Sequence, residues 1–221
     1  MPRGSDRGRR RTAGGLAFSA VVLTVGVGAG TAWAAVTDNI FPTSNAWGTC
    51  SNDPDGGDGD VTCLTDNSQL TYYMDSSGTY ELESPDRTAV RSTMNNDYAP
   101  TDLSVSYDSS PAFSGNAETD VVYQEGSTNL PSSADGVTWC NDAVDNDALE
   151  CDQQYVRIRG NGHYTRGLSC HETGHAVGLL HGNQAYPALS KTDSRLGCMV
   201  TPVGAGTGLG SNNRDNINSM Y

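Results

Sequence analysis

The placement of histidine constrains this chain more than any other feature. Three of its four histidines lie in the stretch 170–182, which reads CHETGHAVGLLHG. His171 and His175 are four residues apart, so on a helix their side chains lie about 40° apart around the axis and about 6 Å apart along it. Both imidazoles can therefore reach one metal ion. Glu172 is turned by about 100° from His171 and can lean over a water on that ion.

The residues after this pair complete a three-nitrogen site. Gly178 can adopt the left-handed backbone conformation that ends a helix and turns the chain, which lets His181 return to the same ion. The H-E-x-x-H spacing is that of a zinc hydrolase. A catalytic zinc keeps one of its four positions open for water. We therefore predict one Zn²⁺ with Glu172 as general base, Gly178 as the turn, and as ligands His171, His175 and His181. A surface helix with solvated histidines is the alternative.

The first 34 residues have the pattern of a secretory signal peptide. Five arginines precede an apolar run over 16–27, and Ala32-Trp33-Ala34 is a small-x-small cleavage site. The apolar run is short and rich in Gly and Ala, which disfavours a permanent membrane span. We expect a secreted, extracellular protein with no membrane attachment after cleavage. An uncleaved anchor is the alternative.

The charge of the remaining chain excludes several partners. The signal segment carries five Arg and one Asp, so residues 35–221 have a formal net charge of −17, against −13 for the whole chain. A protein this acidic repels phosphate backbones and anionic membrane surfaces, so we expect no nucleic-acid partner. The 187 residues suit one domain with a core of its own, or one domain with a small appendage. We expect a monomer.

Six cysteines in an exported chain indicate disulfides rather than thiol chemistry. Six cysteines allow 15 pairings, and the sequence does not choose among them. Spacing favours Cys50–Cys63, Cys140–Cys151 and Cys170–Cys198. A free cysteine that binds metal or acts as a redox switch is the alternative at the third pair.

Hydrophobic periodicity predicts several strands and three helices. We expect strands at 70–74, 103–107, 120–124 and 155–158, with Arg157 and Arg159 facing solvent. Ser84 is the expected N-cap of a first helix that stops before Pro100. Its buried stripe is formed by Ala89, Val90, Thr93 and Met94. The segment 35–66 reads as irregular.

The second predicted helix carries the histidine motif, and a third ends the chain. Thr165 is the expected N-cap of the second, with an inward stripe of Cys170, Thr173, Val177 and Leu180. The third covers 213–221, with an apolar face of Ile217, Met220 and Tyr221. His163 falls in a Gly-rich connector, and we interpret it as a loop residue because the three-histidine site is already complete.

Two acidic turns raise the possibility of a second metal. Asn52–Asp60 and Asn141–Glu150 place several carboxylates inside the two short cysteine loops. Clustered carboxylates in turns can hold Ca²⁺, but neither stretch has the spacing of an EF-hand loop. A solvated acidic turn closed by a disulfide is the favoured interpretation.

The stretch HETGHAVGLLH is similar to the extended zinc motif of the metzincin metallopeptidases, H-E-x-x-H-x-x-G-x-x-H. That clan has a Met-containing turn below the zinc, and Met199 in the segment 198–202 is suitably placed for it. Residues 214–221 resemble the closing helix of matrixin-type members. The resemblance covers about residue 68 to the end.

The resemblance implies an α+β fold. It consists of a metzincin-like zinc peptidase domain over 68–221, with a twisted mixed β-sheet, a long first helix, an active-site helix, a Met-turn and a C-terminal helix. Residues 35–67 would be an irregular, disulfide-linked N-terminal segment. The ligand helix and the Met-turn would meet beneath the zinc, where a Cys170–Cys198 bridge is reasonable. The sequence departs from the clan in lacking a matrixin-type inhibitory propeptide stretch, and Thr201 stands where astacin-like members have a tyrosine.

The activity that the resemblance implies is zinc-dependent hydrolysis of peptide bonds in a polypeptide substrate, with Glu172 moving the proton. The alternative is a catalytically inactive extracellular zinc- or calcium-binding module. A structural zinc site takes four protein ligands and needs no general base, so Glu172 favours the enzyme.

Overall fold

A computed structural model describes residues 36–53, 62–115, 117–145 and 147–221. The predicted signal segment lies outside these residues, as does most of the acidic turn Asn52–Asp60. The part of the chain from Ala35 to Tyr221 is one compact unit. None of its described helices has the length and apolar character needed to cross a membrane. The predicted N-terminal segment and the domain that follows it therefore belong to the same folded body.

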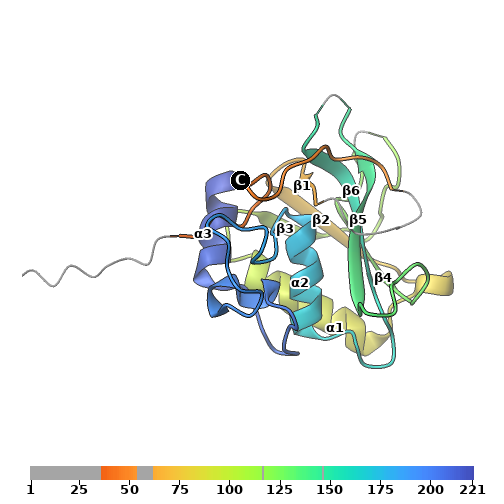
Figure 1. The fold of residues 1–221 in the computed structure, drawn as a ribbon. Helices are drawn as coiled ribbons and strands as arrows, with labels where there is room; N and C mark the ends of the chain where they lie inside the picture. Colours follow the sequence, from red (N-terminus) through yellow and green to blue (C-terminus); the bar gives the residue numbers. More distant parts are fainter. Residues whose placement is uncertain (1–35, 54–61, 116, 146) are drawn as a thin grey trace, which may run out of the picture. The chain divides into compact units, whose positions relative to one another are not determined.

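The described strands form a single mixed sheet (Figure 1). Its strands are β1 (Leu64–Thr65), β2 (Gln69–Met74), β3 (Ser104–Tyr107), β4 (Val121–Glu125), β5 (Gly136–Ala143) and β6 (Glu150–Ile158). The central order β3-β2-β4-β6 is parallel, and β1 pairs in parallel with the first two residues of β6. β5 pairs antiparallel with β6. The chain thus has an α+β structure with a largely parallel sheet.

The first two helices lie on one side of the sheet, and the last lies beyond the second (Figure 1). The first is α1 (Ser84–Thr93), which continues through a π-helical turn over Met94–Tyr98. The second, α2 (Arg166–Ala176), carries most of the histidine motif. A 3₁₀ segment over Ser194–Met199 and α3 (Ser211–Met220) follow it. α2 lies between the sheet and these C-terminal segments, so residues on its two sides meet different parts of the fold.

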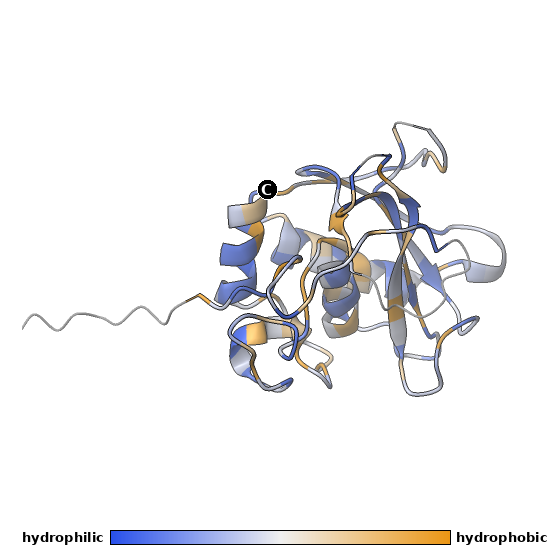
Figure 2. Ribbon diagram, turned by 45° about the horizontal axis from the view of Figure 1, so that its top comes forward, coloured by the Kyte–Doolittle hydropathy of each residue, from blue (hydrophilic) through white to orange (hydrophobic). Residues whose placement is uncertain are grey.

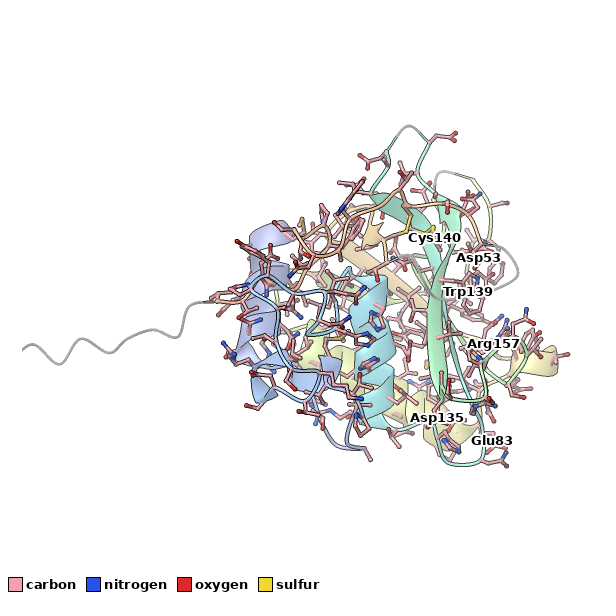
Figure 3. The ribbon with its side chains drawn as sticks, viewed as in Figure 1. Asp53, Glu83, Asp135, Trp139, Cys140 and Arg157 are labelled. Atoms are coloured by element: carbon pink, nitrogen blue, oxygen red, sulfur yellow. A yellow bond between two sulfur atoms is a disulfide. The ribbon has the colours of Figure 1, made fainter. Side chains whose placement is uncertain are left out.

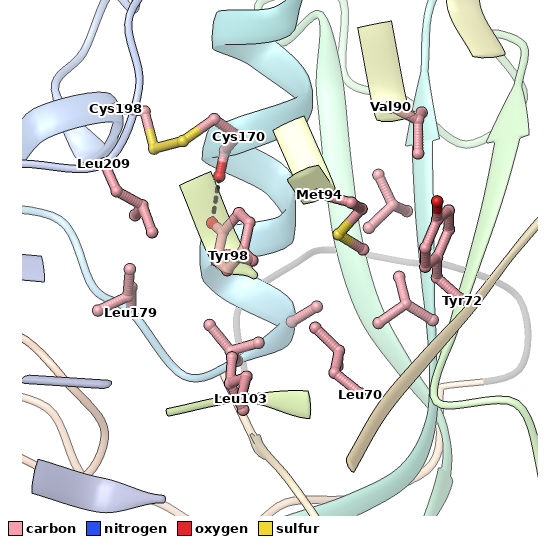
Figure 4. Close-up of a cluster of buried hydrophobic side chains, with 14 of the residues drawn as sticks. Leu70, Tyr72, Val90, Met94, Tyr98, Leu103, Cys170, Leu179, Cys198 and Leu209 are labelled. Carbon is pink, nitrogen blue, oxygen red and sulfur yellow. Dashed lines mark hydrogen bonds between the residues drawn. A yellow bond between two sulfur atoms is a disulfide. The ribbon is translucent and has the colours of Figure 1, made fainter. Parts of the chain in front are cut away.

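The core fills the space between the sheet and α2, and two buried tyrosines fix the position of the helix. Figure 4 shows the Tyr98 hydroxyl, which donates to the Cys170 carbonyl at 2.7 Å. The Tyr123 hydroxyl of β4 lies 2.6 Å from Thr173 Oγ1. Both tyrosine side chains are fully buried. The inward stripe predicted for the motif helix is therefore buried as expected.

Strand β6 corrects one expectation. Arg157 was predicted to face solvent, but it is only 6% exposed. Its guanidinium lies between the rings of Tyr80 and Trp139, 4.2 and 4.8 Å from their centroids, and donates to Gln124 Oε1. Figure 3 shows Arg157 beside Trp139. Because β6 is an inner strand that is covered on both faces, alternation there does not separate core from solvent. Arg159 is also partly buried.

Other differences lie at element boundaries and in one missed strand. β5 was not predicted, and the turn between Cys140 and Cys151 is the end of a β-hairpin. Ser84 is the first residue of α1, and the N-cap is Glu83. Met220 is 39% exposed because it ends α3 at the surface. That helix is largely hydrophilic (Figure 2), and apart from Ile217 its buried residues are all asparagines, namely Asn212, Asn213 and Asn216.

Candidate metal centre

The fold brings the three motif histidines together. The Thr165 side chain accepts from the Leu168 amide and starts α2, so His171 and His175 lie one turn apart on the same helix. Gly178 adopts φ = 87°, the left-handed conformation that ends the helix and returns His181 toward it. One ring nitrogen from each histidine lies within 4.8 Å of the other two. The sequence prediction of this trio therefore matches the geometry.

Backbone carbonyls fix the tautomers of the two helical histidines. His171 Nδ1 lies 2.7 Å from the Cys198 carbonyl, and His175 Nδ1 lies 2.9 Å from the Leu179 carbonyl. Because a carbonyl only accepts, each Nδ1 carries the hydrogen and each Nε2 keeps a free lone pair. Burial lowers the pKa of all three histidines, to about 4 for His171, where His181 adds to the effect. The rings are therefore neutral at pH 7, as metal ligands must be.

This donor set fits a tetrahedral zinc. Ligand nitrogens at about 2.0–2.1 Å from zinc are separated by about 3.3 Å when the angle between them is tetrahedral. His171 Nε2 and His181 Nε2 lie 3.0 Å apart. In zinc sites the ring nitrogen that does not bind the metal commonly donates to a carbonyl or carboxylate, as Nδ1 of His171 and His175 does here. The described residues therefore include a group that could hold a metal such as zinc.

Two glycines of α2 and its turn are required by close packing. A Cβ at Gly178 would lie 2.6 Å from Leu64 Cδ2, so this glycine provides space as well as its backbone angle. A Cβ at Gly174 would overlap the sulfur of Met199, which is fully buried against the helix between the two ligand positions. Met199 thus packs against α2 at Gly174. That it forms the floor of a metal site stays a prediction. Gly174 was missed, because only the folded structure shows what approaches it.

The disulfide Cys170–Cys198 joins the ligand helix to the segment that carries Met199 (Figure 4). The Cα atoms of these two residues are 6.0 Å apart. The Cys198 carbonyl also orients His171. Cys198 therefore holds the ligand helix both through its disulfide bond and through this hydrogen bond. The other bridges are Cys50–Cys63 and Cys140–Cys151. All three pairs are those that spacing favoured.

Glu172 is held against strand β5. Its side chain is buried, and Thr138 Oγ1 lies 2.9 Å both from its backbone carbonyl and from its Oε2. At Gly136 a Cβ would lie 2.5 Å from Glu172 Oε1, so a side chain there would displace the carboxylate from its present position. Burial raises the pKa of Glu172 to about 7, and the hydrogen bond with Thr138 opposes this shift. Thr138 and Gly136 were not predicted, because β5 itself was missed.

A cavity of about 510 Å³ opens over these residues. Its lining includes β5 at 136–138, the segment 200–203, the three histidines and Glu172. His163 lines the same cavity, and its Nδ1 lies 3.1 Å from Asp135 Oδ1. It is not among the converging ligand nitrogens, in agreement with its interpretation as a loop residue.

Potential ligands converge at few other places in the described chain. Apart from the histidines, the group that meets is Cys50, Cys63 and Cys140, whose sulfurs are engaged in disulfides. The carboxylates of the Asn141–Glu150 turn form no such group among the residues described there, and calcium binding stays a prediction. Comparison of the chain with models of known protein families and with curated proteins finds no match.

Proposed function

We propose that the chain is a secreted zinc-dependent endopeptidase of metzincin-like type. The observation that carries the proposal is the meeting of three neutral imidazoles and one buried carboxylate at the same cavity. A purely structural zinc would take a fourth protein ligand, whereas here three histidines converge and the acid Glu172 lines the same cavity. This combination supports hydrolysis rather than storage of a metal.

Each residue has a separate role in this proposal. A zinc ion bound by the three histidines would polarise the scissile carbonyl and lower the pKa of an attacking water. Glu172 accepts the proton of that water and delivers it to the departing amine nitrogen. Thr138 and Gly136 keep its carboxylate on the β5 side of the cavity, where the polypeptide substrate would lie.

Several elements support the metzincin-like part of the proposal. The motif helix lies on a mixed sheet, Met199 is buried against that helix at Gly174, and α3 contacts the 3₁₀ segment that carries Met199. The position two residues after Met199 is Thr201, so a tyrosine of the astacin kind is not offered there. We therefore assign stabilisation of the transition state to the metal alone.

The test is cleavage of casein or gelatin by the wild type and by Glu172→Gln, with and without a chelator. We expect zinc in both proteins, cleavage by the wild type that the chelator abolishes, and a loss of about 10²–10⁴-fold in Glu172→Gln, the range of general acid–base catalysis. Unchanged turnover in the variant would contradict the role of Glu172. Bound zinc without any cleavage by the wild type would favour a non-catalytic zinc-binding module.

A further inference from the structure

The described chain begins with a segment that pairs with the stretch bearing His181. Asp38 and Tyr186 exchange two backbone hydrogen bonds, of 3.0 and 2.7 Å. The Leu180 amide donates to the Asn39 carbonyl and the Phe41 amide to the Gly178 carbonyl, both at 2.8 Å. Residues 36–46, here named the N-terminal brace, therefore lie along the chain on both sides of His181. In Figure 1 the brace is the orange segment that begins near α3.

Side chains of the brace reinforce this pairing beyond His181. Thr43 Oγ1 donates to the Gln184 carbonyl at 2.5 Å, and Asn45 Nδ2 donates to the Ala185 carbonyl at 2.6 Å. Gln184 in turn accepts the backbone amide of His181 through its Oε1, at 3.3 Å. The loop that follows His181 lies in neither helix nor strand. Hydrogen bonds from Thr43 and Asn45 of the brace therefore contribute to its position.

Asn39 connects the brace to the C-terminal helix. Its side chain is fully buried, and its Nδ2 donates to the Leu180 carbonyl at 3.2 Å. Its Oδ1 accepts from Asn216 at 2.7 Å and from Asn212 at 3.0 Å. A buried amide with this many partners is costly to replace, because the Leu180 carbonyl, Asn212 and Asn216 would each lose a hydrogen bond at a buried position. Asn39 thus links α3 to the residue directly before the ligand.

The need for such a link follows from how the ligands are placed. His171 and His175 belong to one helix, and carbonyls at Cys198 and Leu179 hold their rings. Among the described residues no such carbonyl contact holds the ring of His181, which lies beyond the turn at Gly178. Its position therefore depends on the backbone of 179–186, and this is the stretch that the brace contacts.

We propose that the N-terminal brace positions His181, with Asn39 as its central positioning residue. The inference rests on the proposed metal site but does not depend on peptidase activity. It also implies a direction of regulation, because residues 36–46 cannot act as a removable inhibitory segment. Proteolytic loss of these residues would loosen the third ligand and lower zinc affinity rather than release activity.

The test is the dissociation constant of zinc, measured by competition with a chromophoric chelator in the full mature chain. We expect Asn39→Ala to raise it at least about tenfold, the lower end of the range for outer-shell partners of metal ligands. Cobalt(II) absorption in place of zinc should show weakened four-coordinate bands. The control is Leu70→Ala, a buried change in β2 that removes none of the hydrogen bonds of the brace and should leave both measurements unchanged.

If Asn39→Ala does not fold, Thr43→Val decides. It removes the bond to the Gln184 carbonyl together with the bonds that Oγ1 accepts from the Asn45 and Ala46 amides, and it leaves the buried side-chain amides of Asn39, Asn212 and Asn216 intact. It should weaken zinc binding severalfold. If a folded Asn39→Ala or Thr43→Val variant binds zinc as tightly as the wild type, the role of the brace is contradicted. An equal loss of zinc affinity in Leu70→Ala would contradict it too. A wild type that binds no zinc overturns both the brace and the proposed function. A wild type that binds zinc but cleaves nothing overturns only the peptidase.

Discussion

The two sides of α2 support the candidate site in different ways. On the sheet side, β5 holds Glu172 with one threonine hydroxyl and the space left by one glycine. On the other side, the histidines depend on irregular chain, namely the segment with Cys198 and Met199 and the N-terminal brace. The proposed base, Glu172, is thus positioned by regular secondary structure, and the proposed ligands by a disulfide, carbonyls and buried amides. The two supports should therefore fail separately.

The largest effect on the histidine side of α2 is expected from removal of the Cys170–Cys198 bridge. The double change to alanine should lower the free energy of unfolding by about 3–4 kcal/mol, because the bond closes a long loop in the unfolded chain. It should also raise the zinc dissociation constant, since the carbonyl that orients His171 belongs to Cys198. Denaturant unfolding and chelator competition measure the two effects.

The matched control is the double alanine variant of Cys140–Cys151, which closes a shorter loop at the far end of β5 and β6. We expect it to cost about 3 kcal/mol in the same unfolding measurement. Its zinc affinity should equal that of the wild type. If both variants weaken zinc binding to the same extent, global stability rather than local support explains the loss, and the comparison fails.

A smaller effect, confined to catalysis, is expected on the sheet side. Thr138→Val keeps the shape of the side chain but removes the hydrogen bond to Glu172, and bonds to charged groups contribute about 1.5–3 kcal/mol. We expect kcat to fall about 10- to 100-fold while KM and zinc affinity stay unchanged. Thr138→Ser, which restores the hydroxyl, should recover most of the activity. A fall in zinc affinity with Thr138→Val would show that the two supports are not independent.

The same contrast explains how far the sequence could predict this site. The three ligands, Glu172 and the turn glycine lie within eleven residues, and helical geometry alone relates most of them. Met199 was singled out through a resemblance; it is buried, and its role as the floor of a metal site stays a prediction. The strands around 70–74, 120–124 and 155–158 were predicted because their apolar residues form short, dense runs.

Residues that act over long range left no such pattern. Asn39 contacts residues more than 140 positions away, so no local window reveals it. β5 was missed because its apolar residues are interrupted by Thr138 and lead directly into an acidic turn, although Val137 and Trp139 give a weak alternating signal. Arg157 was misplaced because two-sided burial of β6 breaks the rule that alternate residues face solvent.

The smallest effect is expected from Asp86, which should change the stability of the fold without changing the support of Glu172 or of the histidines. Asp86, in the first turn of α1, is buried near Glu125, away from the cavity. Burial raises its pKa from 3.8 to about 7, and its hydrogen bond with Glu125 adds to the shift. A carboxyl whose pKa is raised in the folded state loses stability as the pH rises from about 4 to about 7, since only the unfolded chain releases the proton freely. Asp86→Asn removes that loss.

We therefore expect Asp86→Asn to melt about 2–4 °C higher than the wild type at pH 7 and above, the shift that 1 kcal/mol produces in a domain of this size. The two melting curves should converge below pH 4, where the wild-type carboxyl is protonated in both states. Zinc affinity and kcat should stay at their wild-type values, because neither β5 nor the segments that hold the histidines are touched. A constant difference in melting temperature across this pH range would place the stabilisation in packing rather than in the proton. A change in zinc affinity would mean that the centre responds to overall stability, and that its two supports cannot be separated by the disulfide and Thr138 variants.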